Sequence, residues 1–132
     1  MTVFVDTSGL YALFDNSDIN HEAAKTIWAK LKAETARLVT SYSVLVETTA
    51  LLQSRLGLDA VFELNDKFFP LLDVIWIDNY WYGKAVNRHL KEGRRSLGMV
   101  DCLSFEIMEA REIAMVFTFD THFKIAGFSF VL

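Results

Sequence analysis

Four acidic residues stand at positions where an α/β protein holds its active site. Asp6 and Asp120 directly follow apolar runs that are typical of β-strands. Glu47 lies one turn into the helix after another such run, and Asp101 opens the helix that precedes the run ending at Asp120. Because the carboxyl ends of parallel strands meet at one ligand-binding edge, we expect the four carboxylates to converge there.

Carboxylates that converge in an apolar crevice raise one another's pKa unless a cation neutralises them. A hard divalent ion, Mg²⁺ or Mn²⁺, suits such a site because it takes oxygen ligands and keeps several waters. The single cysteine and three histidines lack the spacing of a zinc site. The acids therefore predict a site for Mg²⁺ or Mn²⁺.

Helix capping is the other interpretation of these acids. Asp6, Asp101 and Asp120 each precede a helical stretch, and aspartate is among the best N-caps. Glu47 does not fit this interpretation, because with Ser43 as the N-cap it lies one residue beyond the capping-box position, among apolar neighbours. A carboxylate in such surroundings needs a partner.

The elements that must position the acids alternate as in βαβ units. Strands are predicted at residues 2–5, 37–40, 73–77, 114–119 and 128–131. Helices are predicted around 10–14, 21–35, 43–56, 58–69, 82–90 and 100–112. The 132 residues contain no linker or repeat, so we predict one α/β domain over residues 1–132, with a mostly parallel five-stranded sheet.

Composition excludes several classes of protein. A hydrophobic content of 52% and an aromatic content of 14% exclude disorder. The longest stretch without a charged residue, 38–46, is too short for a membrane span. The N-terminus lacks the basic region of a secretory signal, so we expect a cytoplasmic protein without membrane association. A net charge of −4 excludes a polycation held to nucleic acid by bulk charge, but not an enzyme with a local basic patch.

Four segments together resemble the PIN-domain ribonucleases that act as toxins in bacterial toxin–antitoxin pairs (VapC-like toxins). The segments are 5–8 (VDTS), 41–47 (SYSVLVE), 100–105 (VDCLSF) and 117–123 (FTFDTHF). The resemblance covers nearly the whole chain. It implies a three-layer α/β/α PIN-like fold, an acidic metal site, and hydrolysis of single-stranded or loop RNA.

The same resemblance assigns expected roles to individual residues. Asp6 and Asp101 match the principal ligands of the Mg²⁺ or Mn²⁺ ion, while Glu47 and Asp120 match acids that complete the site directly or through water. Thr7, Ser8 and Thr118 match supporting hydroxyl positions. Many members have Thr or Ser where this chain has Val100, so one supporting hydrogen bond is either missing here or supplied by Ser104.

RNA also needs basic side chains. Lys84, Arg88, Lys91 and Arg95 recur at spacings of four, three and four along a predicted helix. A solvated helix face is the favoured interpretation for Lys84 and Arg88. We predict RNA contacts for Arg94 and Arg95, which follow that helix and lie next to the predicted site.

Other aromatic and histidine residues are assigned no chemistry. His122 is placed in a turn, and the tryptophans, Trp76 among them, are interpreted as core or interface residues. The aromatic surplus predicts a homodimer or a groove for an antitoxin segment.

Two alternatives to a nuclease stay open. A catalytically degenerate PIN-like RNA-binding module is one, although all four acids are present. A receiver-type signalling domain with Asp78 as phospho-acceptor is the other. It fits less well, because such a site needs adjacent acids after the first strand, where this chain has Thr7.

Overall fold

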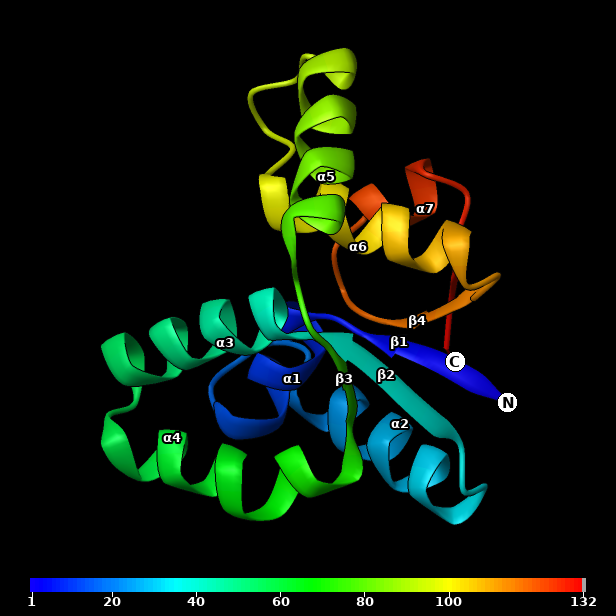
Figure 1. Ribbon diagram of the computed structural model, residues 1–132. Helices are drawn as coiled ribbons and strands as arrows, with labels where there is room; N and C mark the ends of the chain where they lie inside the picture. Colours follow the sequence, from blue (N-terminus) through cyan, green and yellow to red (C-terminus); the bar gives the residue numbers. More distant parts are fainter. Residues whose placement is uncertain (132) are drawn as a thin grey trace.

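A five-stranded parallel sheet forms the centre of the computed structural model, which describes residues 1–131 (Figure 1). The strands are β1 (Thr2–Val5), β2 (Arg37–Ser41), β3 (Asp73–Ile75), β4 (Met115–Phe117) and β5 (Ser129–Phe130). Their spatial order is β3-β2-β1-β4-β5, and all four neighbouring pairs are parallel. The predicted fold class is confirmed, with the sheet parallel throughout rather than mostly parallel.

Helices cover both faces of this sheet, as the three-layer prediction requires (Figure 1). On one side lie α1 (Thr7–Phe14), α2 (His21–Ala33), α3 (Tyr42–Arg55) and α4 (Leu58–Glu63). The chain then continues through a π-helical turn (Leu64–Phe68) and a 3₁₀ turn (Phe69–Leu71). On the other side lie α5 (Asn79–Glu92), α6 (Met99–Ala110) and α7 (His122–Ile125), of which α7 was not predicted.

The strand order decides where a ligand can bind. From β1 the chain proceeds outward to β2 and β3, and it then returns across the sheet to β4 on the other side of β1. The order therefore reverses between β1 and β4, and the crevice outside the carboxyl ends of these two strands is the general ligand site of such sheets. Asp6 and Asp120 follow these two strands.

Close packing of α1 against β4 brings the two strand ends together. Gly9 lies so near β4 that a Cβ atom added to it would be 2.6 Å from the carbonyl oxygen of Phe117. The backbone N–H of Asp6 also donates to that oxygen, at 3.1 Å. Only glycine permits this approach, so the first turn of α1 is held at the crevice.

The core is apolar on both faces of the sheet. Val3, Phe4 and Val5 of β1 are all completely buried, as is Phe117 of β4. Trp28 of α2 packs on Phe117 with a ring separation of 5.9 Å. No helix within residues 1–131 is long and apolar enough to cross a membrane.

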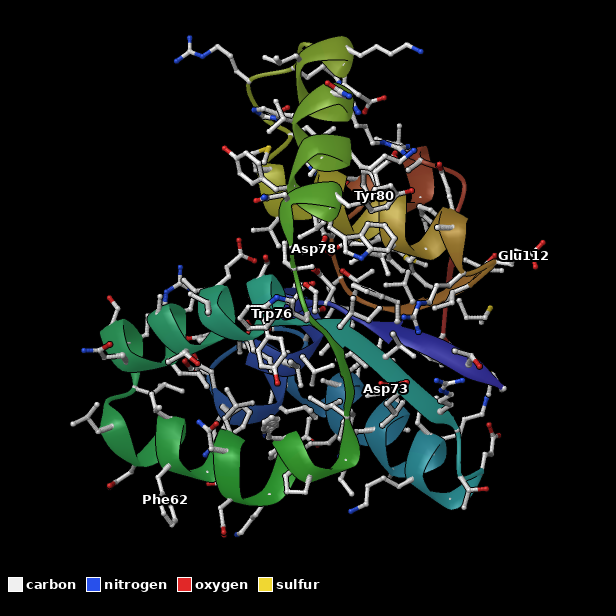
Figure 2. The ribbon with its side chains drawn as sticks, viewed as in Figure 1. Phe62, Asp73, Trp76, Asp78, Tyr80 and Glu112 are labelled. Atoms are coloured by element: carbon white, nitrogen blue, oxygen red, sulfur yellow. The ribbon has the colours of Figure 1, made fainter. Side chains whose placement is uncertain are left out.

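Two details of the sequence interpretation are corrected by the fold. Ser41, not Ser43, is the N-cap of α3, and its Oγ accepts a hydrogen bond from the N–H of Val44 at 3.2 Å. The chain passes from β2 into α3 without a loop, so the last strand residue caps the helix. Of the two interpretations of Trp76, the core one is wrong, because 71% of its surface is exposed on the connection between β3 and α5, and the interface one stays a prediction (Figure 2).

Candidate metal-binding cleft

A cleft of about 380 Å³ opens at the carboxyl ends of β1 and β4. It is lined by Asp6, Thr7, Ser8, Tyr11, Asp18, Asn20, Glu47, Leu51, Arg55, Asp101, Phe119 and Asp120. The four acids singled out in the sequence all lie in this one cleft, together with Thr7 and Ser8.

Asp6 is the deepest of the four acids, with 3% of its surface exposed. Its Oδ2 accepts hydrogen bonds from the hydroxyl of Thr118 at 2.8 Å, the hydroxyl of Ser8 at 3.2 Å and the N–H of Ser8 at 3.4 Å. These three hydrogen bonds all reach Oδ2, and the backbone N–H of Thr7 also stabilises the carboxylate. Asp6 is also the N-cap of α1, so the capping interpretation and the site interpretation both apply to it.

A chain of hydroxyl groups fixes Asp6 relative to the end of β4. The hydroxyls of Ser8 and Thr118 are 2.8 Å apart. Either hydroxyl can be the donor in this contact, and both also lie within hydrogen-bond distance of Asp6 Oδ2. The N–H of Phe119 donates to Ser8 Oγ at 2.8 Å, and the N–H of Asp120 donates to Thr118 Oγ1 at 3.0 Å. The two strand ends are thus joined by side chains as well as by the sheet.

Asp101 approaches from the other layer, in the first turn of α6. Burial, followed by the charges of Asp6, Asp120 and Glu47, raises its pKa to about 7. Burial also raises the pKa of Asp6 to about 6, against the effect of its hydrogen bonds. Both raised pKa values mean that negative charge is unfavourable in this cleft unless a proton or a cation neutralises it. The N-cap of α6 is Gly98, so the capping interpretation of Asp101 is wrong.

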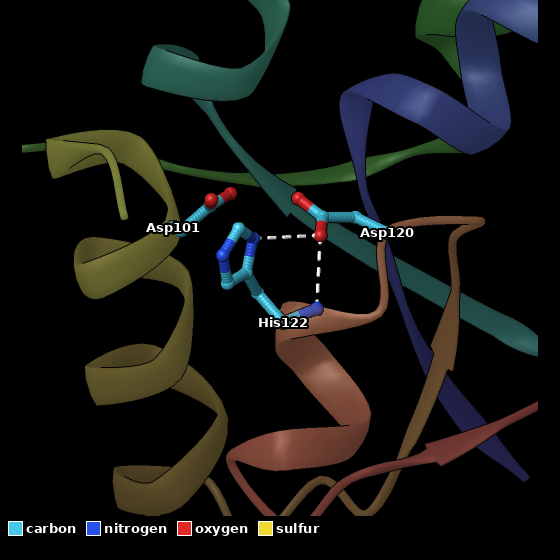
Figure 3. A group of neighbouring side chains, drawn as sticks. All are labelled: Asp101, Asp120 and His122. Atoms are coloured by element: carbon cyan, nitrogen blue, oxygen red, sulfur yellow. Dashed lines mark hydrogen bonds and ion pairs between the residues drawn. The ribbon is translucent and has the colours of Figure 1, made fainter. Parts of the chain in front are cut away.

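His122 joins the acids, a role that the sequence analysis did not assign. Asp101, Asp120 and His122 each offer one ligand atom, and these atoms lie within 4.8 Å of one another (Figure 3). The Nδ1 and the backbone N–H of His122 both contact Asp120 Oδ1, each at 2.9 Å. The unpredicted helix α7 begins at His122, and that turn directs the ring toward Asp101. The two-residue spacing from Asp120 was the only signal of this in the sequence.

Glu47 reaches the cleft from α3, where it is half-buried. The next residue, Thr48, was also missed: its hydroxyl is completely buried, donates to the carbonyl of Val44 at 2.7 Å, and lies 3.3 Å from the hydroxyl of Thr7. This contact ties the start of α1 to the middle of α3. It thereby sets the position of Glu47 relative to the first strand.

Ser104 does not support the acids as expected. Its hydroxyl donates to the carbonyl oxygen of Val100, one turn earlier in α6, at 2.9 Å. The side chain is buried in the helix packing, and its single proton is already used there. The hydroxyl that many PIN domains carry before the third acid therefore has no replacement from Ser104 in this chain.

The basic stripe proves to be largely structural. Arg88 of α5 donates to Glu106 at 2.8 Å and to Glu109 at 2.9 Å, both on α6, and only 17% of its side chain is exposed. Lys84 lies 3.9 Å from the same Glu106. The solvated-face interpretation is therefore wrong for Arg88, because it clamps the two helices together. Arg94 is exposed and pairs with Glu92 at 3.2 Å, outside the cleft.

Asp78 has a structural explanation as well. It is the N-cap of α5 and accepts a hydrogen bond from the N–H of Trp81 at 3.1 Å (Figure 2). This carboxylate follows β3, at the edge of the sheet, and is not among the residues that line the acidic cleft. Nothing in this arrangement favours a receiver-type phospho-acceptor.

The fold and this cleft are those of a PIN domain. The family model for the PIN domain matches residues 3–129, and the chain belongs to this family. Two similar proteins, each named 23S rRNA-specific endonuclease VapC20, come from Mycobacterium tuberculosis strains CDC 1551 / Oshkosh and ATCC 25618 / H37Rv. Each is 32% identical to this chain over 127 residues, which is 96% of this chain and 95% of the relative.

A solved structure agrees with the sequence match. The crystal structure of Mycobacterium tuberculosis VapC20, described as a sarcin-ricin loop cleaving toxin, superposes with a TM-score of 0.84 and 31% sequence identity. The match covers 96% of this chain and 95% of that one. The predicted family is confirmed, and the receiver-type alternative is wrong.

Proposed function

We propose that this protein is a metal-dependent RNA endonuclease that cleaves single-stranded or loop RNA as the toxin of a toxin–antitoxin pair. The observation that carries the proposal is the convergence of Asp6, Glu47, Asp101 and Asp120 in one cleft, two of them with raised pKa values. The similarity to VapC20 over 96% of the chain supports RNA, and a ribosomal RNA loop in particular, as the substrate.

The residues present fit a divalent ion. The donors are carboxylate oxygens with one imidazole nitrogen nearby, a set that suits Mg²⁺ or Mn²⁺. The side-chain hydrogen bonds to Asp6 all reach Oδ2 and none reaches Oδ1, and Asp101 lies where burial and neighbouring negative charges favour a cation. Asp6 and Asp101 are the proposed principal ligands. Glu47 and Asp120 complete the site directly or through water, and His122 adds its nitrogen.

A bound divalent ion supplies Lewis acidity toward the scissile phosphate and lowers the pKa of water. In this proposal Glu47 and Asp120 accept hydrogen bonds from the attacking water and orient it. Ser8 and Thr118 hold Asp6 in one rotamer, and Thr7 is fixed against Thr48 at the entrance to α1. Rigid placement of these groups lowers the entropic cost of reaching the transition state.

Cleavage of a mixed RNA pool that includes 23S rRNA tests the proposal. The wild type, an Asp6→Asn and Asp101→Asn double variant, and an Arg111→Gln control are each assayed with EDTA, Mg²⁺ or Mn²⁺. We expect cleavage by the wild type and the control only when metal is present, and none by the double variant. Folded wild type that binds RNA but never cleaves it would instead favour the degenerate binding module.

Association is also proposed: with a small antitoxin protein, and with a second copy of the chain as a homodimer in the cytoplasm. Val46 and Trp76 support it, because 69% and 71% of their surfaces are exposed beside the cleft entrance. Tyr42 packs edge-on against Trp76 at 5.5 Å, which makes the patch aromatic. Light scattering of the purified chain should give twice its 15.1 kDa mass, and a Trp76→Ser variant should give the monomer mass.

A further inference from the structure

We infer that Arg55 is a phosphate-binding residue of the cleft, which holds an RNA phosphate that flanks the scissile one. The inference rests on the proposed function and adds a substrate contact to it. Of the side chains that line the cleft, five are carboxylates and one is a cation, Arg55. Neither Arg94 nor Arg95, where RNA contacts were predicted, lines this cleft.

The position of Arg55 follows from the periodicity of α3. Glu47, Leu51 and Arg55 are spaced by four residues, so they share one face of the helix, and all three line the cleft. Eight residues at a rise of about 1.5 Å place Arg55 about 12 Å along the helix from Glu47. Its guanidinium stacks on Tyr11 and not on one of the four acids, so a phosphate next to the scissile one is the better placed partner. A neighbouring phosphate of the same strand is within its reach.

The guanidinium of Arg55, an exposed residue, has one aromatic contact. It lies over the ring of Tyr11, 5.2 Å from the ring centroid. Tyr11 is itself buried, and its hydroxyl donates to Asp15 at 2.6 Å, which fixes the ring. An arginine stacked on an immobile ring loses less conformational entropy when it binds a ligand than a freely rotating one does.

In the part of the chain that the structure describes, the charge of Arg55 is only a minor influence on the pKa values of Tyr11 and Asp15. It forms no ion pair there, in contrast to Arg37, Arg88 and Arg94, which pair with acids. Guanidinium and phosphate match in geometry and form two parallel hydrogen bonds. The five carboxylates of the cleft repel the phosphates of an entering RNA strand. A bound metal ion would neutralise only the carboxylates that bind it. Arg55 supplies attraction farther along the strand.

The test compares Arg55→Gln, Arg55→Lys and the control Arg111→Gln. Arg111 is an exposed arginine at the far end of α6, outside the cleft, so its variant removes the same charge from another place. Cleavage kinetics are measured on a fluorescent stem-loop RNA with Mn²⁺. Affinity is measured by anisotropy at several salt concentrations, in an Asp101→Asn background that does not cleave.

For Arg55→Gln we expect KM to rise about tenfold with kcat within about twofold, because Arg55 does not touch the reacting atoms. The slope of log affinity against log salt should weaken by about 0.7, the value for one lost contact to single-stranded nucleic acid. Arg55→Lys should keep the slope but not the full affinity, since a lysine keeps the charge without the planar fork.

Unchanged KM and salt slope in Arg55→Gln, with a wild type that cleaves, would overturn the inference and leave the proposed function standing. An equal rise in KM and an equal weakening of the salt slope in Arg111→Gln would also overturn the inference, because the effect would then be one of net charge. If the wild type neither cleaves nor binds the RNA, the proposed function fails and the inference fails with it. Thermal melting of each variant shows whether it is folded.

Discussion

Replacing Asp101 with Asn should stabilise the metal-free protein at pH 8, although under the proposed function the same change should abolish cleavage. The pKa of Asp101 is raised from 3.8 to about 7, first by burial and then by the charges of Asp6, Asp120 and Glu47. The folded state therefore holds this proton more tightly than the unfolded state does. The cost is absent below pH 3.8, grows as the pH rises toward 7, and is fully present above that value.

The magnitude follows from the size of the shift. About 3 pKa units at about 1.4 kcal/mol each give about 4 kcal/mol. Water reaches part of this carboxylate, so a discount by about half leaves about 2 kcal/mol. Loss of a favourable charge from the first turn of α6 subtracts about 0.5 kcal/mol. We therefore expect Asp101→Asn to exceed the wild type by about 1.5 kcal/mol at pH 8 and to match it near pH 4.

Urea denaturation in EDTA at pH 4, 6 and 8 measures these differences. Asp59→Asn is the matched control, because Asp59 is an exposed acid in the first turn of α4, away from the cleft. Adding Mg²⁺ or Mn²⁺ at pH 8 should stabilise the wild type and reverse the ranking, since an ion that binds only the folded state stabilises it. A wild type that gains stability from pH 4 to pH 8 without metal, relative to Asp101→Asn, would refute the reasoning.

Three further substitutions test how the cleft is positioned. Thr118→Val removes the hydroxyl that donates to Asp6, so Mn²⁺ affinity should fall about 10- to 100-fold in an EPR titration, with Thr118→Ser as the restoring control. Gly9→Ala forces a Cβ against the carbonyl of Phe117, and urea denaturation should show a loss of about 2–3 kcal/mol; an unchanged midpoint would contradict the close approach. Arg88→Ala breaks the clamp between α5 and α6 and should cost about 2 kcal/mol while RNA affinity stays at the wild-type level; a weaker affinity in the folded variant would return Arg88 to the RNA-binding surface.

Local sequence patterns predicted the succession of the five strands and the longer helices along the chain. They also singled out the four acids. Apolar runs and helical periodicity depend on residues close together in the chain, and they predicted all five strands. Asp6 and Asp120 could be placed because each directly follows a strand, and the strand ends of a parallel sheet share an edge. Glu47 and Asp101 were placed at the same edge from their positions in the helices after β2 and before β4, and the family resemblance assigned their roles.

Other features depended on contacts between distant segments. Ser104 and Thr118 are both hydroxyl residues near an acid, yet Ser104 bonds its own helix while Thr118 bonds Asp6, 112 residues away. The spacing of Arg88 in the sequence predicted a solvated helix face, but in the structure two glutamates of α6 pair with it. Side-chain direction and partner choice are decided by the packing of whole elements, and periodicity within one element carries no information about them.

The sequence alone determined the succession of the strands and the longer helices along the chain and the acids at the strand ends, because these follow from local propensity and residue type. Only the tertiary structure decided that His122 turns toward Asp101 and that Arg55 enters the cleft. The direction of His122 depends on where α7 begins. The position of Arg55 depends on the stacking of its guanidinium over the ring of Tyr11. Both arise from long-range packing, which places side chains by contacts that no short window of sequence contains.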